Sequence, residues 1–294
     1  MGRAAIVVGV DGAAASLDAV RWAAAEAGLR QVPLEVLLAY HWRVPLTAFA
    51  PTAALAESAG RHAREMVDQA AREARATAPG ITVTGTAAIG RPAPALLQAA
   101  DGAVMLVVGT RSHHAVTGAL LGSVSQQVAA HAGCPVAVVR GRADPSGSVL
   151  VGVDGAPSAV QVTRSAFAEA RLRGCDLLAV RAVETPMAPY TVGMPPLMYD
   201  TAEVRRSLTE EATRLVAAIG ADYPDVPWEL HGVDGDAAEV LVRRSRAVQL
   251  AVVGSRGHGG FAGLLLGSVG LHLLHRAECP VLVVRGGAAP GEES

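Results

Sequence analysis

A glycine-rich segment near the C-terminus carries the residue types and spacing from which an anion site can be built. In residues 250–269, LAVVGSRGHGGFAGLLLGSV, an apolar stretch leads to Gly254, then to Gly257 after two residues and to Gly267 after nine more. The apolar stretch is typical of a buried parallel strand, and the glycines permit positive φ and close approach of a ligand to the backbone. Ser268 stands where the N-cap of a helix is expected. Free N–H groups and the positive dipole at a helix start favour an anion, most often a phosphate.

A second segment, residues 105–124, repeats this arrangement. Its sequence, MLVVGTRSHHAVTGALLGSV, has Gly109, then Ser112 after two residues and Gly122 after nine more. The serine replaces the second glycine. If that position needs positive φ, a serine there is strained by roughly 1 to 2 kcal/mol, which would weaken or reshape the first loop. Its hydroxyl could instead help to hold a phosphate, and we expect a bound nucleotide in both halves.

The same register relates the rest of the two halves. Three residues of the first half, Gly109, Ser123 and Cys134, each precede a counterpart by 145 residues: Gly254, Ser268 and Cys279. The openings IVVGVDGAAAS and VLVGVDGAPS also match, with Asp11 and Asp154 separated by 143 residues. Two copies of so long a unit indicate paired domains rather than a solenoid of short repeats. We therefore place one domain at residues 1–142 and the other at 147–286, joined by the polar segment GRADPSG.

These motifs occur in one order in each half: an opening strand with Val-Asp-Gly, the G-x2-G-x9-G-S pattern or its serine variant, and a closing Cys-Pro-Val strand. In this the chain resembles a tandem universal stress protein of the ATP-binding subclass over nearly its whole length. The resemblance implies an α/β fold of two tandem Rossmann-like (adenine nucleotide α-hydrolase-like) domains. Each would hold a five-stranded parallel sheet of order 3-2-1-4-5, with ATP, and Mg²⁺ as a candidate companion ion, between strands 1 and 4. The general rule for open parallel sheets also places ligands at such a switch point.

Candidate binding residues follow from these motifs. Asp11 and Asp154 end the opening strands, where a carboxylate could accept a hydrogen bond from a ribose hydroxyl or a base amino group, or could only shape the turn. The chain contains no lysine, so a side-chain cation near a phosphate must be arginine or histidine. The candidates around the phosphates are Gly109, Arg111, Ser112, Gly122, Ser123 and Val124 in the first half, and Gly254, Arg256, Gly257, Gly267, Ser268 and Val269 in the second.

The end of the second strand of each half is the expected place of the adenine. The resemblance implies contact through backbone groups, here near His41 in the first half and Ala182 in the second. His41 could stack on the base, or it could be a loop histidine that faces solvent. The apolar pattern also predicts a helix over residues 16–29 and another over residues 57–77, whose charged residues would form a solvated face.

Composition narrows the class of protein. The formal net charge of −2 and the lack of a basic stripe argue against nucleic-acid binding. No apolar run approaches the roughly 18 residues of a membrane helix, and no signal-like segment precedes the first strand, so we expect a cytoplasmic protein. Hydrophobic residues make up 51% but aromatic residues only 3%, which predicts a core of Val, Leu, Ile and Ala. The three cysteines lack CxxC spacing and are expected to be core thiols.

Several enzyme classes do not fit the motifs. A P-loop needs GxxxxGK[ST], and a dinucleotide dehydrogenase needs GxGxxG after the first strand; neither is present. His272 and His275 have helical spacing, but without HExxH or a third ligand we predict no metal site. No pair of general base and nucleophile is evident, so we predict no catalytic residue and a nucleotide-dependent regulatory module with slow or no ATP hydrolysis. The alternatives are a weak ATP-hydrolysing or adenylate-transferring enzyme, and an apo interaction or dimerisation module.

The closing strands, VAVVR and VLVVR, should lie at sheet edges. Exposed apolar edges need cover or pairing. The resemblance implies that these fifth strands pair across a two-fold axis, so the two halves would form an intramolecular pseudo-dimer. A further homodimer of the whole chain is left open.

Overall fold

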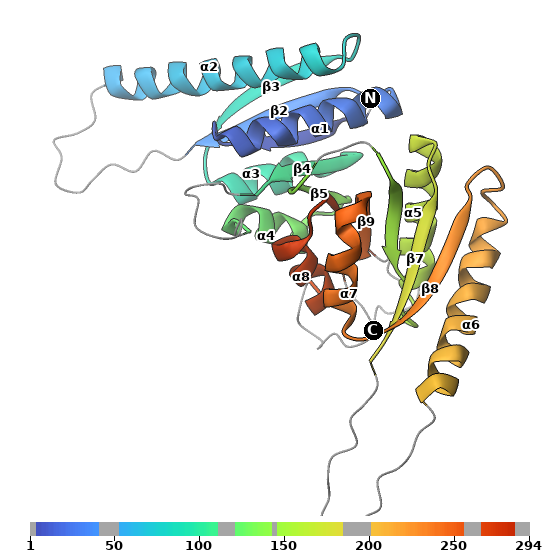
Figure 1. Cartoon of the computed structure of the whole chain (residues 1–294). Helices are drawn as coiled ribbons and strands as arrows, with labels where there is room; N and C mark the ends of the chain where they lie inside the picture. Colours follow the sequence, from blue (N-terminus) through green and yellow to red (C-terminus); the bar gives the residue numbers. More distant parts are fainter. Residues whose placement is uncertain are drawn as a thin grey trace, which may run out of the picture. The chain divides into compact units, whose positions relative to one another are not determined.

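The computed structural model describes residues 4–40, 53–110, 121–142, 146–184, 201–255 and 266–285. The chain divides into two compact units, of which the first contains Met1–Ala143 with Leu274–Arg276 and Pro280–Val283. The second contains Asp144–Leu273, Ala277–Cys279 and Val284–Ser294. Each unit is an α/β arrangement of a sheet with flanking helices (Figure 1).

The first unit alternates strands and helices along the chain. Its elements are β1 (Ile6–Val10), α1 (Ala14–Arg30), β2 (Leu34–Tyr40), α2 (Ala53–Thr77), β3 (Val83–Ile89), α3 (Pro92–Ala99), β4 (Met105–Gly109), α4 (Ser123–His131) and β5 (Val136–Val139). The strands pair in the order β3-β2-β1-β4-β5, all in parallel. The chain passes from β1 to β2 on one side and later returns to β4 on the other, so the sheet changes winding direction between β1 and β4.

The second unit repeats this plan. Its elements are β6 (Ser148–Gly152), α5 (Ala159–Arg173), β7 (Leu177–Val183), α6 (Thr201–Gly220), β8 (Trp228–Asp234), α7 (Ala237–Arg244), the 3-10 turn η1 (Ser245–Ala247), β9 (Val248–Gly254) and α8 (Ser268–Arg276). The strands β8-β7-β6-β9 pair in parallel in this order. A final strand, β10 (Val281–Val284), has the sequence position of β5. The predicted α/β, Rossmann-like fold is confirmed in both halves.

Small aliphatic residues build the core, as the composition predicts. Ile6 and Leu106 in the first sheet, and Leu150 and Leu250 in the second, are fully or almost fully buried. The inner face of α1 consists largely of buried alanines, Ala19, Ala23, Ala24 and Ala27. Cys134 and Cys279 are buried, as expected of core thiols, whereas Cys175 is partly exposed. Within the described residues, no helix is long and apolar enough to cross a membrane.

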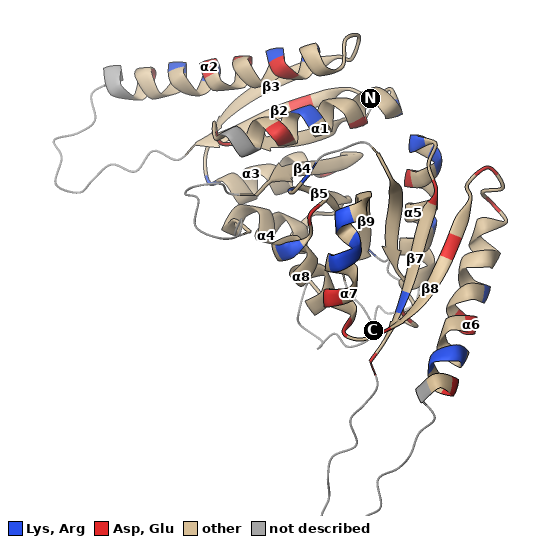
Figure 2. Cartoon of the chain, viewed as in Figure 1, with Lys and Arg blue, Asp and Glu red and all other residues tan. Residues whose placement is uncertain are grey.

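Helix α2 confirms the expected division into an apolar and a charged face, although it begins at Ala53 rather than residue 57. Val67 and three alanines on its inner side, Ala63, Ala70 and Ala74, are buried. Figure 2 shows residues of both charge signs along the helix. Arg61 pairs with exposed Glu57 at 2.8 Å, one turn earlier. These charges are on solvent-facing positions and do not form a single-sign patch.

Glycines in the strands allow helices to pack closely on the sheets. A Cβ at Gly9 would lie 2.9 Å from Leu96 Cδ2, and a Cβ at Gly152 would lie 2.8 Å from Leu241 Cδ1. α3 and α7 therefore approach the first strand of their units at equivalent glycines. A Cβ at Gly85 of β3 would overlap Cγ1 of Val67, the buried side chain of α2.

We predict that Gly85→Ala destabilises the protein by about 1 to 3 kcal/mol, the usual cost of overpacking a core. Val67 is β-branched and has few alternative rotamers, so it cannot easily move away from the added methyl group. Gly133→Ala is the matched control, because no atom lies within 4 Å of a Cβ at that position. The free energy of unfolding should be measured for both variants by urea denaturation. Equal stabilities would contradict this account of α2 packing.

Candidate functional site

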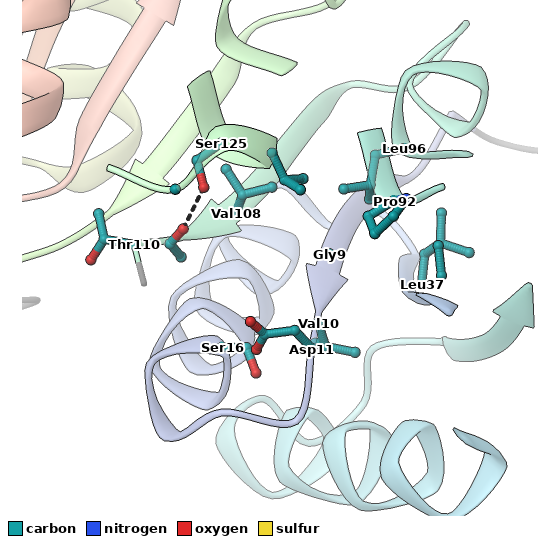
Figure 3. Close-up of a pocket in the computed structure, with 14 residues that line it drawn as sticks. Gly9, Val10, Asp11, Ser16, Leu37, Pro92, Leu96, Val108, Thr110 and Ser125 are labelled. Atoms are coloured by element: carbon teal, nitrogen blue, oxygen red, sulfur yellow. Dashed lines mark hydrogen bonds between the residues drawn. The ribbon is translucent and has the colours of Figure 1, made fainter. Parts of the chain in front are cut away.

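The carboxyl ends of β1 and β4 and the start of α4 enclose a pocket in the first unit. Its volume is about 140 Å³. It lies at the change of winding direction, because β1 pairs with β2 on one side and with β4 on the other. The lining residues are Gly9, Val10, Asp11, Ser16, Leu37, Ala39, Pro92, Leu96, Val108, Gly109, Thr110, Gly122, Val124 and Ser125 (Figure 3).

Apolar side chains form one wall of the pocket. Figure 3 shows Leu37 of β2 together with Pro92 and Leu96 of α3, and Val108 of β4 lines the same cavity. Leu96 reaches this position because Gly9 has no side chain to displace it. Such a wall suits a flat apolar group rather than a charged one.

Asp11 and Ser16 form a polar part of the pocket (Figure 3). Asp11 Oδ1 accepts a hydrogen bond from the Ala13 amide at 3.0 Å. The Ser16 hydroxyl donates to the Ala13 carbonyl at 2.7 Å, which fixes the start of α1. Asp154 makes the equivalent turn in the second unit, accepting from the Ala156 amide at 3.1 Å. The turn role and a ligand role are compatible, because a carboxylate has further lone pairs beyond the one used in the turn.

The predicted N-cap of the helix that follows the second glycine loop is wrong by one residue. The N-cap of α8 is Gly267, with φ −70 and ψ 158, and the expected N-cap Ser268 is the first helical residue. Gly122 caps α4 in the same conformation, with φ −69 and ψ 150. The Gly267 carbonyl accepts the first helical hydrogen bond, from the Leu271 amide at 2.9 Å, so the serine follows the cap by one position.

Neither helix start has a side-chain cap or an acidic residue in its first turn. The first-turn amides therefore keep their capacity to bind an external acceptor, and the helix dipole favours a negative one. Ser123 and Ser268 are exposed at these starts. Their positions are suited to contact a phosphate together with the amides of Val124 and Val269.

The structure brings together most of the predicted residues it describes. In the first unit Asp11, Gly109, Gly122 and Val124 line one pocket, and Ser123 lies between two of them. In the second unit Asp154 follows β6 and Gly254 ends β9, which are paired neighbours. Ala182 on β7 corresponds to Ala39, which lines the first pocket. The remaining predicted residues, His41, Arg111, Ser112, Arg256 and Gly257, lie outside the described part of the chain.

Sequence reasoning missed several pocket residues. Leu37, Pro92 and Leu96 form the apolar wall but belong to no motif, and only the tertiary packing brings them to the site. Thr110 and Ser125 are also buried pocket residues. Their signal was present in the sequence, because Thr110 directly follows Gly109 and Ser125 lies three residues after Gly122, in the first turn of the helix. The Ser125 hydroxyl donates to the Gly109 carbonyl at 2.8 Å.

Comparison with known proteins covers both halves of the chain. The model of the universal stress protein family matches residues 3–140 and 146–285. A universal stress protein of Mycobacterium tuberculosis is 35% identical over 289 residues, covering 95% of this chain and 96% of the relative. One from Mycolicibacterium smegmatis is 35% identical over 292 residues, with the same coverage. The crystal structure of a universal stress protein from Archaeoglobus fulgidus has a TM-score of 0.71 at 20% identity, covering 96% of this chain and 98% of that one.

The turn at Asp11 gives a test of its structural role. Asp11→Asn keeps an acceptor for the Ala13 amide, so we expect thermal stability close to that of the unsubstituted chain. Asp11→Ala removes the acceptor and should lower stability by about 0.5 to 1.5 kcal/mol, the usual value of one hydrogen bond. Unfolding monitored by circular dichroism measures both. An Asn variant as unstable as the Ala variant would contradict this role of the turn.

Proposed function

This chain belongs to the universal stress protein family, and from that membership we propose that it is an ATP-binding regulatory protein of the cytoplasmic stress response. It acts by nucleotide occupancy, with slow or no ATP hydrolysis. The observation that carries the proposal is the convergence of Asp11, Gly109 and the start of α4, which has no side-chain cap, at one pocket on the switch point of the sheet. Open parallel sheets bind nucleotides at this position, with phosphates at a helix start.

The chemistry of the pocket suggests how a nucleotide would lie. The base would pack on the apolar wall that includes Leu37 and Leu96, and Asp11 would accept hydrogen bonds from the ribose. The phosphates would extend to the amides of Ser123 and Val124. The described residues enclose about 140 Å³, less than the roughly 300 Å³ of a small ligand site. This volume suits part of a nucleotide rather than the whole molecule, so we place the nucleoside in the pocket and the phosphates over the start of α4. Mg²⁺ would accompany the phosphates.

The pocket favours binding over catalysis. Asp11 is the one ionisable side chain among its described lining residues. Hydrolysis of ATP needs a group that activates or orients water, and enzymes that transfer an adenylate also need a positioned acceptor. A carboxylate held in a turn beside the ribose serves neither purpose.

Pairing of the fifth strands completes the proposal. All four residues of β5 and all four of β10 are buried, although each strand is the last of its half. An apolar edge needs a partner, so we propose that the two halves form an intramolecular pseudo-dimer through these strands. Light scattering on the purified chain would separate this monomeric arrangement from a homodimer.

The first test is the nucleotide that the purified protein carries and can bind. Heat denaturation followed by ion-exchange chromatography and mass spectrometry should release adenine nucleotide, with up to two per chain after saturation with ATP. The absence of released nucleotide together with no binding of added ATP would overturn the proposal. It would favour the apo interaction alternative.

Substitution of the N-cap glycines tests the phosphate position. Gly122 and Gly267 have φ near −70, so a side chain there requires no unusual backbone conformation. Aspartate is a favourable N-cap but repels phosphate, so Gly122→Asp and Gly267→Asp should each abolish ATP binding in one half while the chain remains folded. Asparagine at the same position has the same size and no charge, and should impair binding less. Equal ATP affinities of the Asp variants and the unsubstituted chain would contradict the site.

Asp11→Asn provides a test of the ribose contact. Since the turn keeps its acceptor, we expect a loss of ATP affinity in the first half of about tenfold without a loss of stability, as hydrogen bonds to charged groups are worth about 1.5 to 3 kcal/mol. Isothermal titration calorimetry in the Gly267→Asp background isolates that half. An unchanged affinity would leave Asp11 with its turn role alone.

A further inference from the structure

The two glycine loops are closed by different hydrogen bonds. In the first unit the buried Ser125 side chain, in the first turn of α4, donates to the Gly109 carbonyl at 2.8 Å. In the second unit the corresponding residue is Gly270, which has no hydroxyl. There the Gly267 amide donates to the Ser255 carbonyl at 2.7 Å. Each bond ties the end of a strand to the start of the following helix, one through a side chain and the other through the backbone.

This difference changes the number of amides that can bind an anion. In the first unit no described residue accepts a hydrogen bond from the Gly122 amide at the N-cap of α4. In the second unit the equivalent Gly267 amide already donates a hydrogen bond to the Ser255 carbonyl. A phosphate at α8 would therefore meet one fewer free N–H group than a phosphate at α4.

The two units also differ in the charged residue at the rim of the crevice, and this difference again favours an anion in the first unit. The N-cap of α3, next to the pocket residue Pro92, is the exposed Arg91. The equivalent N-cap of α7 is the exposed Asp236, which accepts from the Glu239 amide at 2.9 Å. An anionic ligand is attracted by the first rim and repelled by the second, with a modest contribution because both groups are exposed.

One cation in the second unit needs to be considered. Arg181 of β7 takes the place of Leu38 and donates to the Val153 carbonyl at 3.2 Å. The pocket residues of β2 are Leu37 and Ala39, on either side of Leu38. Val153 is the counterpart of the pocket residue Val10, so the Arg181 guanidinium adds a positive charge near the carboxyl end of β6. It does not restore the Gly267 amide, which remains bonded to the Ser255 carbonyl.

We propose that the two halves are unequal nucleotide sites, with the first binding ATP at least about tenfold more tightly, and with Ser125 as a positioning residue for it. This inference rests on the proposed function. The Ser125 hydroxyl closes the first loop without using an amide, so the N-terminal amides of α4 remain available for phosphate. The second loop is closed by one of its own anion-binding amides. The order is opposite to the one that the Ser112 substitution alone predicts.

Gly270 offers a way to install the missing hydroxyl. A Cβ at this position would lie 3.5 Å from the Gly254 carbonyl oxygen and 3.7 Å from Leu266 Cδ1, so the space accepts a side chain. A serine hydroxyl there could donate to Gly254 as Ser125 does to Gly109. Gly270→Ala is the matched control, because it adds the same Cβ without the hydroxyl, and its gain in helix propensity is larger than that of serine.

The experiment measures ATP affinity in each half separately by isothermal titration calorimetry. Gly267→Asp leaves only the first site and Gly122→Asp only the second, and circular dichroism checks that each chain is folded. We expect a dissociation constant at least about tenfold lower for the first site. Titration of the unsubstituted chain should show the same two classes of site, which keeps the test valid if either variant fails to fold. Equal affinities, or a tighter second site, would overturn the inference while leaving the proposed function intact.

The positioning role has its own test. In the Gly267→Asp background, Ser125→Ala should weaken ATP binding several-fold, whereas Ser125→Thr, which retains the hydroxyl, should bind like the parent. In the Gly122→Asp background, Gly270→Ser should bind more tightly than Gly270→Ala. A Ser125→Ala variant that binds like Ser125→Thr would overturn the role of Ser125. If the unsubstituted chain binds no ATP at all, both the inference and the proposed function fail.

Discussion

Parallel pairing of β1 with two neighbours is the constraint on which the site depends. Ile6 pairs with Leu34 of β2 and with Met105 of β4, and this register continues toward the carboxyl end of the sheet. Because all three strands run in the same direction, the residue that follows β1 and the glycine that ends β4 meet at one edge. Helices leave this edge on both faces of the sheet, and their starts present amides toward it. The pocket is a consequence of topology before it is a consequence of particular side chains.

Close packing determines how much space that topology leaves. Gly9 lets Leu96 approach β1, and Gly152 lets Leu241 approach β6, so both halves bring a helix down onto the first strand. The alanines on the buried face of α1 have a similar effect on the other side of the first sheet. Because the core residues are small, the helices lie close to the strands of the sheet. In the first half this packing puts a leucine, rather than empty space, behind the expected position of the base.

The sequence allowed the strands and the glycine positions to be predicted, because these depend on local pattern and on an internal repeat. The strand order was predicted from the resemblance to the universal stress protein family. The prediction of Ser268 as the N-cap was wrong by one residue. Serine is a common N-cap, but glycine is also accepted at that position, and here the preceding Gly267 occupies it. The apolar wall could not be predicted. Leu37 and Leu96 are ordinary core residues by pattern, and only their distance to the sheet edge makes them pocket residues. The closure of the loop by Ser125 likewise joins residues 16 positions apart.

Duplication makes it possible to separate what the fold requires from what the site requires. Both halves keep the strand order, the close glycine on the first strand and the aspartate turn, and these features involve many contacts across the sheet. The features that differ between the halves, Ser125 against Gly270 and Arg91 against Asp236, involve single hydrogen bonds or exposed charges. Changes of this kind cost little stability but act directly on an anion, because the free amides at a helix start are few. A duplicated unit can therefore diverge in ligand affinity while each copy retains its sheet and core.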